Sequence, residues 1–258
     1  MYLGIIGKSG CDKIKISRLF GKTIVWIMTH LDSTSTPSFD YIYNFINWCN
    51  ALNSDQKLEE DNEIYYASFA HPLKAIVSMI TGVPFNILSD YSTKNDYIIN
   101  FKTFEYKLHE NETLTSPEDL FSKMSNNLHL NYNDKPVTPN IWMTVNNFVI
   151  YFGYYICRNY LGKDIWTLVE KNSNSNFSTN GYRIYTDIRT IPEYEYIREM
   201  NGKIIRINQN IGSSIISDKE LFSLPVDIDI PIYSSINDLY EIIYKECYSL
   251  IHPEKQLL

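Results

Sequence analysis

The chain contains 258 residues, of which 44% are hydrophobic, and its formal net charge is -7 at pH 7. This composition can fill the core of one large α/β domain, expected to cover residues 1–258, whereas dispersed basic residues argue against direct nucleic-acid binding. The 4 cysteines form no Cys-x-x-Cys pair, which argues against zinc and a disulfide framework, and without a signal peptide or membrane span a cytoplasmic protein is expected.

The first predicted elements are a buried strand at Tyr2–Ile6 and a loop that leads into a helix beginning at Lys13. A phosphate-binding loop has glycines that let backbone N–H groups turn toward the phosphates, and a lysine that meets the β and γ phosphates. Gly7, Gly10 and Lys13 have this spacing. The strand, loop and helix therefore predict a phosphate-binding site.

Two residues of this region oppose phosphoryl chemistry. Asp12 stands where glycine is expected, and at about 4 Å its carboxylate would repel a phosphate by roughly 1 kcal/mol in water and ~4 kcal/mol in a partly buried site. Ile14 stands where a hydroxyl is expected as a magnesium ligand. The sequence therefore predicts the fold of a phosphate-binding protein with weakened catalysis.

A second phosphate-loop ending, Gly21-Lys22-Thr23, follows a helical pattern instead of a strand. A phosphate cradle has to follow a strand and open a helix, because only then do its N–H groups and the helix dipole face the ligand. Gly21 is therefore interpreted as the C-cap of the first helix. The apolar stretch Thr23–His30 fits either a strand or a helix.

The rest of the chain alternates between strand-like and helix-like segments. Strands are predicted at residues 64–69, 182–186, 203–207 and 226–230, and helices at 39–52, 71–80, 144–160, 164–170, 192–200 and 236–250. Thr144 is expected near an N-cap, and Gly82 with Pro84 to end the helix before them. Such alternation is typical of a three-layer α/β/α fold with a mainly parallel sheet.

Two regions are expected to be long insertions, at residues 22–62 and 90–140. The second is polar and has no sustained periodicity, which favours a lid or a partner-binding region over core. Asp187, by contrast, is predicted at the end of a strand, on the carboxyl edge of the sheet where ligands bind in such folds.

Several segments resemble, in order, the deoxynucleoside monophosphate kinases of phages and large DNA viruses, a branch of the P-loop nucleotide kinases. The resemblance omits residues 21–62 and 90–140. It rests on Gly7-Lys8-Ser9-Gly10-Cys11-Asp12-Lys13, Phe69-Ala70-His71-Pro72-Leu73-Lys74, Gly153-Tyr154-Tyr155-Ile156-Cys157-Arg158 with Asp164-Ile165-Trp166, and Asp187-Ile188-Arg189-Thr190-Ile191-Pro192-Glu193 with the following Asn201–Ile207.

The resemblance implies a P-loop nucleotide kinase-like fold and a set of functional residues. Those implied to bind nucleotide are Gly7, Lys8, Ser9, Gly10, Lys13 and Lys74; those implied to be catalytic are Lys13, Arg158, Asp187 and Arg189. Arginine suits phosphate oxygens because its guanidinium presents a fixed fork of donors. An active enzyme would use ATP and Mg²⁺ to phosphorylate a deoxynucleoside monophosphate, an inactive one would need neither, and no metal site formed by protein ligands alone is expected.

The sequence also departs from the family. Asn146 replaces an arginine expected near the substrate phosphate, Ile150 replaces a glutamine, Tyr155 replaces an acidic residue, and Ile215–Asp218 lacks a histidine. Phosphoryl transfer depends mostly on positioning and charge stabilisation, so these losses lower the expected rate.

Structural alternatives stay open for the two arginines. Arg158 could interact with the dipole at a helix C-terminus, and Arg189 could form a surface i,i+4 pair with Glu193.

We therefore expect a catalytically impaired, nucleotide-kinase-like protein that serves as a binding or structural protein, for a protein partner or as a homo-oligomer. The alternative is an active ATP-dependent deoxynucleoside monophosphate kinase in which Ser9, Lys15 or Ser17 compensates for the altered loop. A viral chain of this kind would lie in the host cytoplasm or in the virion.

Overall fold

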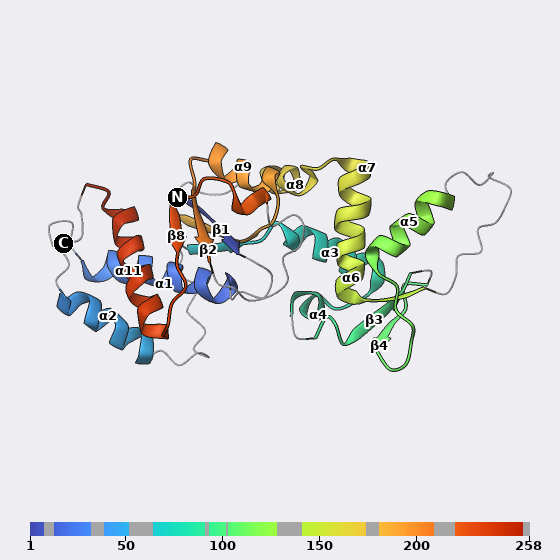
Figure 1. Ribbon diagram of the computed structural model, residues 1–258, viewed down its shortest axis with the longest axis horizontal. Helices are drawn as coiled ribbons and strands as arrows, with labels where there is room; N and C mark the ends of the chain where they lie inside the picture. Colours follow the sequence, from blue (N-terminus) through green and yellow to red (C-terminus); the bar gives the residue numbers. More distant parts are fainter. Residues whose placement is uncertain are drawn as a thin grey trace. The chain divides into compact units, whose positions relative to one another are not determined.

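The computed structural model describes residues 1–7, 13–31, 39–51, 64–90, 93–101, 103–127, 141–173, 181–208 and 220–254 (Figure 1). The chain divides into two compact units. Unit 1 comprises Met1–Ser68 and Asn176–Leu258, and unit 2 comprises Phe69–Ser175.

Unit 1 is built on a five-stranded sheet in which every neighbouring pair of strands is parallel. The strand order is β2-β6-β1-β7-β8, and the strands are β1 (Tyr2–Gly7), β2 (Ile64–Ala67), β6 (Tyr182–Ile188), β7 (Lys203–Ile207) and β8 (Ile228–Ile230). β1 therefore lies in the middle of the sheet. The predicted α/β class and the mainly parallel sheet are confirmed.

Helices cover both faces of this sheet, namely α1 (Lys13–His30), α2 (Phe39–Ala51), α9 (Ile191–Glu199) and α11 (Ile236–Ile251). Leu3 and Ile5 of β1 share one buried cluster with apolar residues of α1, α2 and α11. Gly4 points to the opposite face, since strand side chains alternate, and a Cβ added there would lie 3.1 Å from Ile197 of α9. The arrangement is compatible with three layers.

Unit 2 contains an antiparallel sheet of order β4-β3-β5 and a set of helices. The strands are β3 (Tyr97–Asn100), β4 (Tyr106–Leu108) and β5 (Trp142–Thr144); the helical segments are α3 (Ala70–Thr81), α4 (Phe85–Ser89), α5 (Pro117–Asn127), α6 (Val145–Ile150), the π-helix η1 (Tyr151–Arg158), α7 (Asn159–Leu161) and α8 (Ile165–Ser173).

Most predicted element boundaries agree with the structure, including two helix ends. Thr144 caps α6, because its Oγ1 accepts a hydrogen bond from the Asn147 N–H at 3.1 Å. Gly82 ends α3 in the left-handed conformation with a φ of 72°, which glycine adopts without a steric penalty.

The prediction that Gly21 ends the first helix is wrong, because Gly21 lies inside α1. α1 continues through Thr23–His30, so this stretch is helical. Gly21 is buried beneath β2, and a Cβ at this position would collide with the hydroxyl of Tyr66. The glycine therefore allows close packing of helix and strand, and a phosphate loop at Gly21-Lys22-Thr23 is excluded because no strand precedes it.

Elements also occur where the sequence showed no sustained periodicity. β3, β4 and α5 lie within residues 90–140, and Ile98 and Ile99 of β3 are fully buried in unit 2. These strands have 4 and 3 residues, which is too short for an alternating pattern to stand out. Residues 128–140 lie outside the described residues, as do 32–38 and 52–63 of the other expected insertion.

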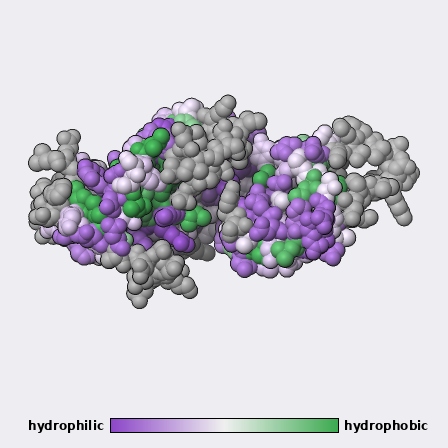
Figure 2. All heavy atoms as spheres, turned by 60° about the horizontal axis from the view of Figure 1, so that its bottom comes forward, coloured by the Kyte–Doolittle hydropathy of each residue, from purple (hydrophilic) through white to green (hydrophobic). Residues whose placement is uncertain are grey.

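Hydrophobic residues reach the surface of both units between hydrophilic ones (Figure 2). No helix in the described ranges is both long enough and apolar enough to cross a membrane.

Candidate functional site

The strand order of unit 1 places a ligand-binding edge at the carboxyl end of β1. β1 is followed in the chain by β2, on one side of it in the sheet, whereas β7 is followed by β8 on the other side. The chain therefore diverges between β1 and β7. In open parallel sheets, ligands bind outside the carboxyl ends of the strands at such a switch point.

Lys13 lies over this edge. It is the first residue of α1, and its Nζ donates a hydrogen bond to the backbone carbonyl of Gly7 at 2.6 Å. Gly7 is the last residue of β1. The ammonium group is thus held beside the end of the central strand, and its role in phosphate binding stays a prediction. Lys8, Ser9 and Gly10, the other predicted nucleotide-binding residues of the loop, lie outside the described residues.

The first turn of α1 offers no hydroxyl for magnesium. Ile14 is 57% exposed and carries no ligand atom. Ser17 is buried one turn further on, and its Oγ donates a hydrogen bond to the Lys13 carbonyl at 2.5 Å. Ser17 is therefore engaged within the helix and does not replace the missing hydroxyl. The residues described at this position do not fit a magnesium ion held by the loop.

β6, the neighbour of β1, carries an irregularity at its carboxyl end. Gly4 pairs with Tyr185 and Ile6 with Ile188, so three steps along β6 match two along β1. The extra residue makes a β-bulge, a device that re-aims side chains and is frequent beside active sites. Asp187 lies within it. The structure thus places Asp187 at the predicted edge of the sheet.

Asp187 is held by a residue from the neighbouring strand. Its side chain is buried, with the residue 9% exposed, and Ser68 Oγ donates a hydrogen bond to its Oδ2 at 2.7 Å. Ser68 directly follows β2. Ser68 could not be linked to Asp187 from the sequence, because 119 residues separate the two and no local pattern connects them.

Arg189 follows β6 directly and has an exposed side chain. Its expected surface pair with Glu193 is not what the structure shows, because Glu193 is only 3% exposed. The Glu193 carboxylate accepts hydrogen bonds from the backbone N–H groups of Arg189 at 2.7 Å and Thr190 at 3.1 Å. Glu193 therefore caps α9 and is buried, whereas a surface position was expected for it.

Lys74 and Arg158 belong to unit 2, on α3 and at the end of η1. The two helices touch where Leu73 packs against Gly153, since a Cβ at Gly153 would collide with Leu73. The Arg158 guanidinium lies 5.9 Å from the centroid of the Tyr154 ring. The helical segment continues through α7 to Leu161, so Arg158 lies within the last turn of that segment, where a cation can interact with the helix dipole.

A second polar cluster that the sequence did not predict lies at the carboxyl ends of β7 and β8. Arg206 donates to both oxygens of Asp229, from Nε at 3.2 Å and from Nη2 at 2.5 Å. Asn208 also donates to Asp229. The bonds to this carboxylate raise the pKa of the Arg206 guanidinium. The charges of Arg206 and Asp229 neutralise one another.

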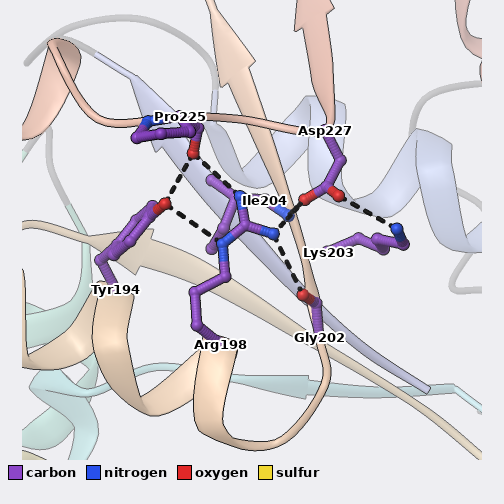
Figure 3. Close-up of polar contacts among 7 residues, drawn as sticks. All are labelled: Tyr194, Arg198, Gly202, Lys203, Ile204, Pro225 and Asp227. Carbon is purple, nitrogen blue, oxygen red and sulfur yellow. Dashed lines mark hydrogen bonds and ion pairs between the residues drawn. The ribbon is translucent and has the colours of Figure 1, made fainter.

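The opposite, amino edge of the sheet carries a network that joins α9, β7 and the segment before β8 (Figure 3). Arg198 donates to Asp227 at 2.5 Å, to Tyr194 Oη at 3.2 Å and to the Pro225 carbonyl at 2.9 Å. Asp227 also accepts from Lys203 Nζ at 3.0 Å and from the Ile204 N–H at 2.8 Å. With its donors and acceptors matched to one another, this network is structural.

The contacts of the Figure 3 network lower the pKa of the Asp227 carboxyl. Burial alone would raise the pKa of the Asp227 carboxyl, but hydrogen bonds from the Ile204 N–H, Lys203 and Arg198 outweigh burial and hold the pKa below its ordinary value.

The described residues at the carboxyl edge include both cationic side chains and a buried carboxylate. Lys13 and Arg189 offer N–H donors to phosphate oxygens, and Asp187 is the acid that accompanies them. Within the described ranges, no three His, Cys, Asp or Glu side chains gather as a metal site would require.

Comparisons with protein-family models and with curated proteins find no match to this chain.

Proposed function

We propose that this chain is a nucleotide-kinase-like protein that binds a nucleoside phosphate at the carboxyl edge of the unit 1 sheet, and that it is catalytically impaired and serves as a binding or structural protein. The observation that carries the proposal is the Lys13 ammonium held 2.6 Å from the Gly7 carbonyl, between the central strand and the first turn of α1. A parallel sheet supplies the edge, and the start of an 18-residue helix adds its positive dipole end.

Impaired transfer follows from the residues beside Lys13. Phosphoryl transfer needs a magnesium ion to neutralise charge on the phosphates, and P-loop enzymes hold it with a hydroxyl next to the lysine. Ile14 offers none, and Ser17 is bound to a helix carbonyl. Binding needs only the cations and backbone donors, so it can persist where transfer is lost.

An active ATP-dependent deoxynucleoside monophosphate kinase is the second candidate. The observation that favours it is the placement of Asp187 and Arg189 at the same sheet edge as Lys13. A carboxylate and a guanidinium beside a phosphate are the groups that transfer chemistry uses.

Binding is tested by calorimetric titration of the full chain with ATP and with each of dAMP, dCMP, dGMP and dTMP. Lys13→Ala should weaken ATP binding by about 10- to 100-fold, because a hydrogen bond to a charged group is worth about 1.5–3 kcal/mol. Lys245→Ala is the matched control, since Lys245 lies on the exposed side of α11 and pairs with Glu241; it should leave ATP binding unchanged. Equal binding by all three proteins, or none by the wild type, contradicts the proposal.

Transfer is tested with γ-labelled ATP, magnesium and the same four monophosphates. We expect no labelled diphosphate above the level of Lys13→Ala. The double variant Asp12→Gly/Ile14→Thr restores the glycine and the hydroxyl of the loop pattern and should raise transfer at least tenfold. Wild-type product that disappears in Lys13→Ala would instead support the active kinase.

A further inference from the structure

Glu193 is a buried acid whose carboxylate is directed at the backbone of the candidate site. It is 3% exposed, and its Oε2 accepts from the N–H of Arg189 at 2.7 Å and from the N–H of Thr190 at 3.1 Å. A buried carboxylate is costly to desolvate and is kept where its hydrogen bonds compensate. The shorter of the two bonds is the one to Arg189, and it fixes the backbone of that residue.

Arg189 itself is fixed at the backbone and exposed at the side chain. It follows the last residue of β6, whose Ile188 pairs with Ile6 of β1, so it lies one strand away from the Gly7 end that holds Lys13. Its guanidinium makes no hydrogen bond or ion pair with the described part of the chain. A guanidinium anchored at its base and open at its tip is suited to a phosphate from solution.

The same carboxylate determines how a phosphate can approach. Glu193 occupies the N–H groups of Arg189 and Thr190, which directly precede α9, and places an acidic side chain in the first turn of that helix. A ligand phosphate would be repelled from these N–H groups by that charge. Among the described residues at this end of β6, the Arg189 side chain is the exposed cation that an anion can meet, and the backbone from which it extends is held by Glu193.

We propose that Glu193 is a positioning residue, which orients Arg189 toward the phosphate of a nucleoside monophosphate. This inference rests on the proposed function, because it assumes that the carboxyl edge of the unit 1 sheet binds nucleoside phosphates. Glu193 does not touch the ligand. It acts by holding the peptide groups from which the Arg189 side chain extends.

A matched control is present in the same unit. α11 begins with the same kind of capping box, in which Asp238 accepts from the N–H groups of Ser235 at 2.9 Å and Ser234 at 3.2 Å. No arginine occurs in that turn. Asp238 is exposed, unlike Glu193, so Asp238→Asn neutralises a cap with the same hydrogen-bond pattern at the surface. It changes no anion-binding side chain, and it separates the loss of a cap charge from the loss of positioning.

The test is a double-mutant cycle read by titration with dAMP, dCMP, dGMP and dTMP, using the best-bound nucleotide. Arg189→Ala should weaken binding about 10- to 100-fold and Glu193→Gln about 3- to 10-fold. Asp238→Asn should leave binding within twofold. The double variant Glu193→Gln/Arg189→Ala should bind as weakly as Arg189→Ala alone, because Glu193 acts only through that arginine.

Each outcome of the cycle is informative. Additive losses in the double variant, or wild-type binding by Glu193→Gln, overturn the positioning role while leaving the proposed function intact if Lys13→Ala still weakens binding. Wild-type protein that binds none of the nucleotides overturns the proposed function, and this inference with it. If Glu193→Gln does not fold, Glu193→Asp takes its place in the cycle, since its shorter side chain keeps the charge but moves the carboxylate away from the two N–H groups.

Discussion

Substituting Asp227 by asparagine should destabilise unit 1, because the Figure 3 network depends on its carboxylate. Asp227 is 21% exposed at the side chain and accepts from Arg198, Lys203 and the Ile204 N–H. The bond to Arg198 is worth about 1.5–3 kcal/mol and the backbone bond about 1 kcal/mol, whereas an exposed lysine pair adds about 0–1 kcal/mol. The amide oxygen of asparagine keeps one acceptor, so we expect a loss of about 2–3 kcal/mol.

The assay is urea unfolding at 25 °C, followed by circular dichroism and tryptophan fluorescence. Because the chain has two compact units, two transitions are expected, and only the one that reports unit 1 should move. Lys203→Ala is the comparison variant, since its side chain is 46% exposed and its loss should cost about 0.5 kcal/mol. Equal effects of the two substitutions would refute the assigned role of the carboxylate.

The effect of Asp227→Asn on stability should depend on pH. The folded pKa of Asp227 is lowered, so the carboxylate stabilises the fold at pH values above its unfolded pKa of about 3.9, and this stability is lost as the pH falls through the folded pKa. The difference in unfolding free energy between wild type and Asp227→Asn should therefore be full at pH 7 and shrink below about pH 4. A difference that does not change with pH contradicts this reasoning.

Two further pairs of variants test the packing of unit 1. Tyr244→Phe should leave the unfolding free energy unchanged or raise it by up to about 1 kcal/mol, because the buried Tyr244 hydroxyl has no hydrogen-bond partner in the described chain. Tyr194→Phe should lower the unfolding free energy by about 1–2 kcal/mol, because the substitution removes the hydrogen bond to the Pro225 carbonyl. Gly21→Ala should cost no more than about 1 kcal/mol, because the added Cβ meets the outer end of the Tyr66 side chain, which is 43% exposed and can move aside. Gly21→Ala/Tyr66→Phe should recover part of this loss, since it removes the hydroxyl that the Cβ meets. Urea unfolding measures all four variants, and an inverted order within either pair would show that the contacts are wrongly assigned.

The strands of unit 1 could be predicted because each is a short segment rich in isoleucine or tyrosine, residues that favour strands. Gly21 could not be interpreted correctly from its neighbours, because the reason for a glycine there is Tyr66, which approaches from another strand. β3 and β4 were missed because 4 and 3 residues are too few to show a period. The structure at these positions therefore depends on tertiary packing, which local sequence patterns do not show.

The candidate site also combines features that could be predicted from the sequence with features that could not. The spacing of Gly7 and Lys13 is local, and Asp187 could be placed at the carboxyl edge once β6 was recognised as a strand. The bond from Ser68 to Asp187 and the burial of Glu193 arise only when distant segments meet. These contacts could not be predicted, because no residue near them in the sequence specifies their partner.

The measurement that tests the central claim most directly is hydrogen exchange of the full chain with and without saturating ATP. The account predicts slower amide exchange in the segments at the carboxyl ends of β1 and β6, in peptides covering residues 1–20 and 183–195, and unchanged exchange at the amino edge around Asp227. Lys13→Ala should abolish the protection. Protection confined to other segments, or protection that survives Lys13→Ala, would show that nucleotide does not bind at this edge.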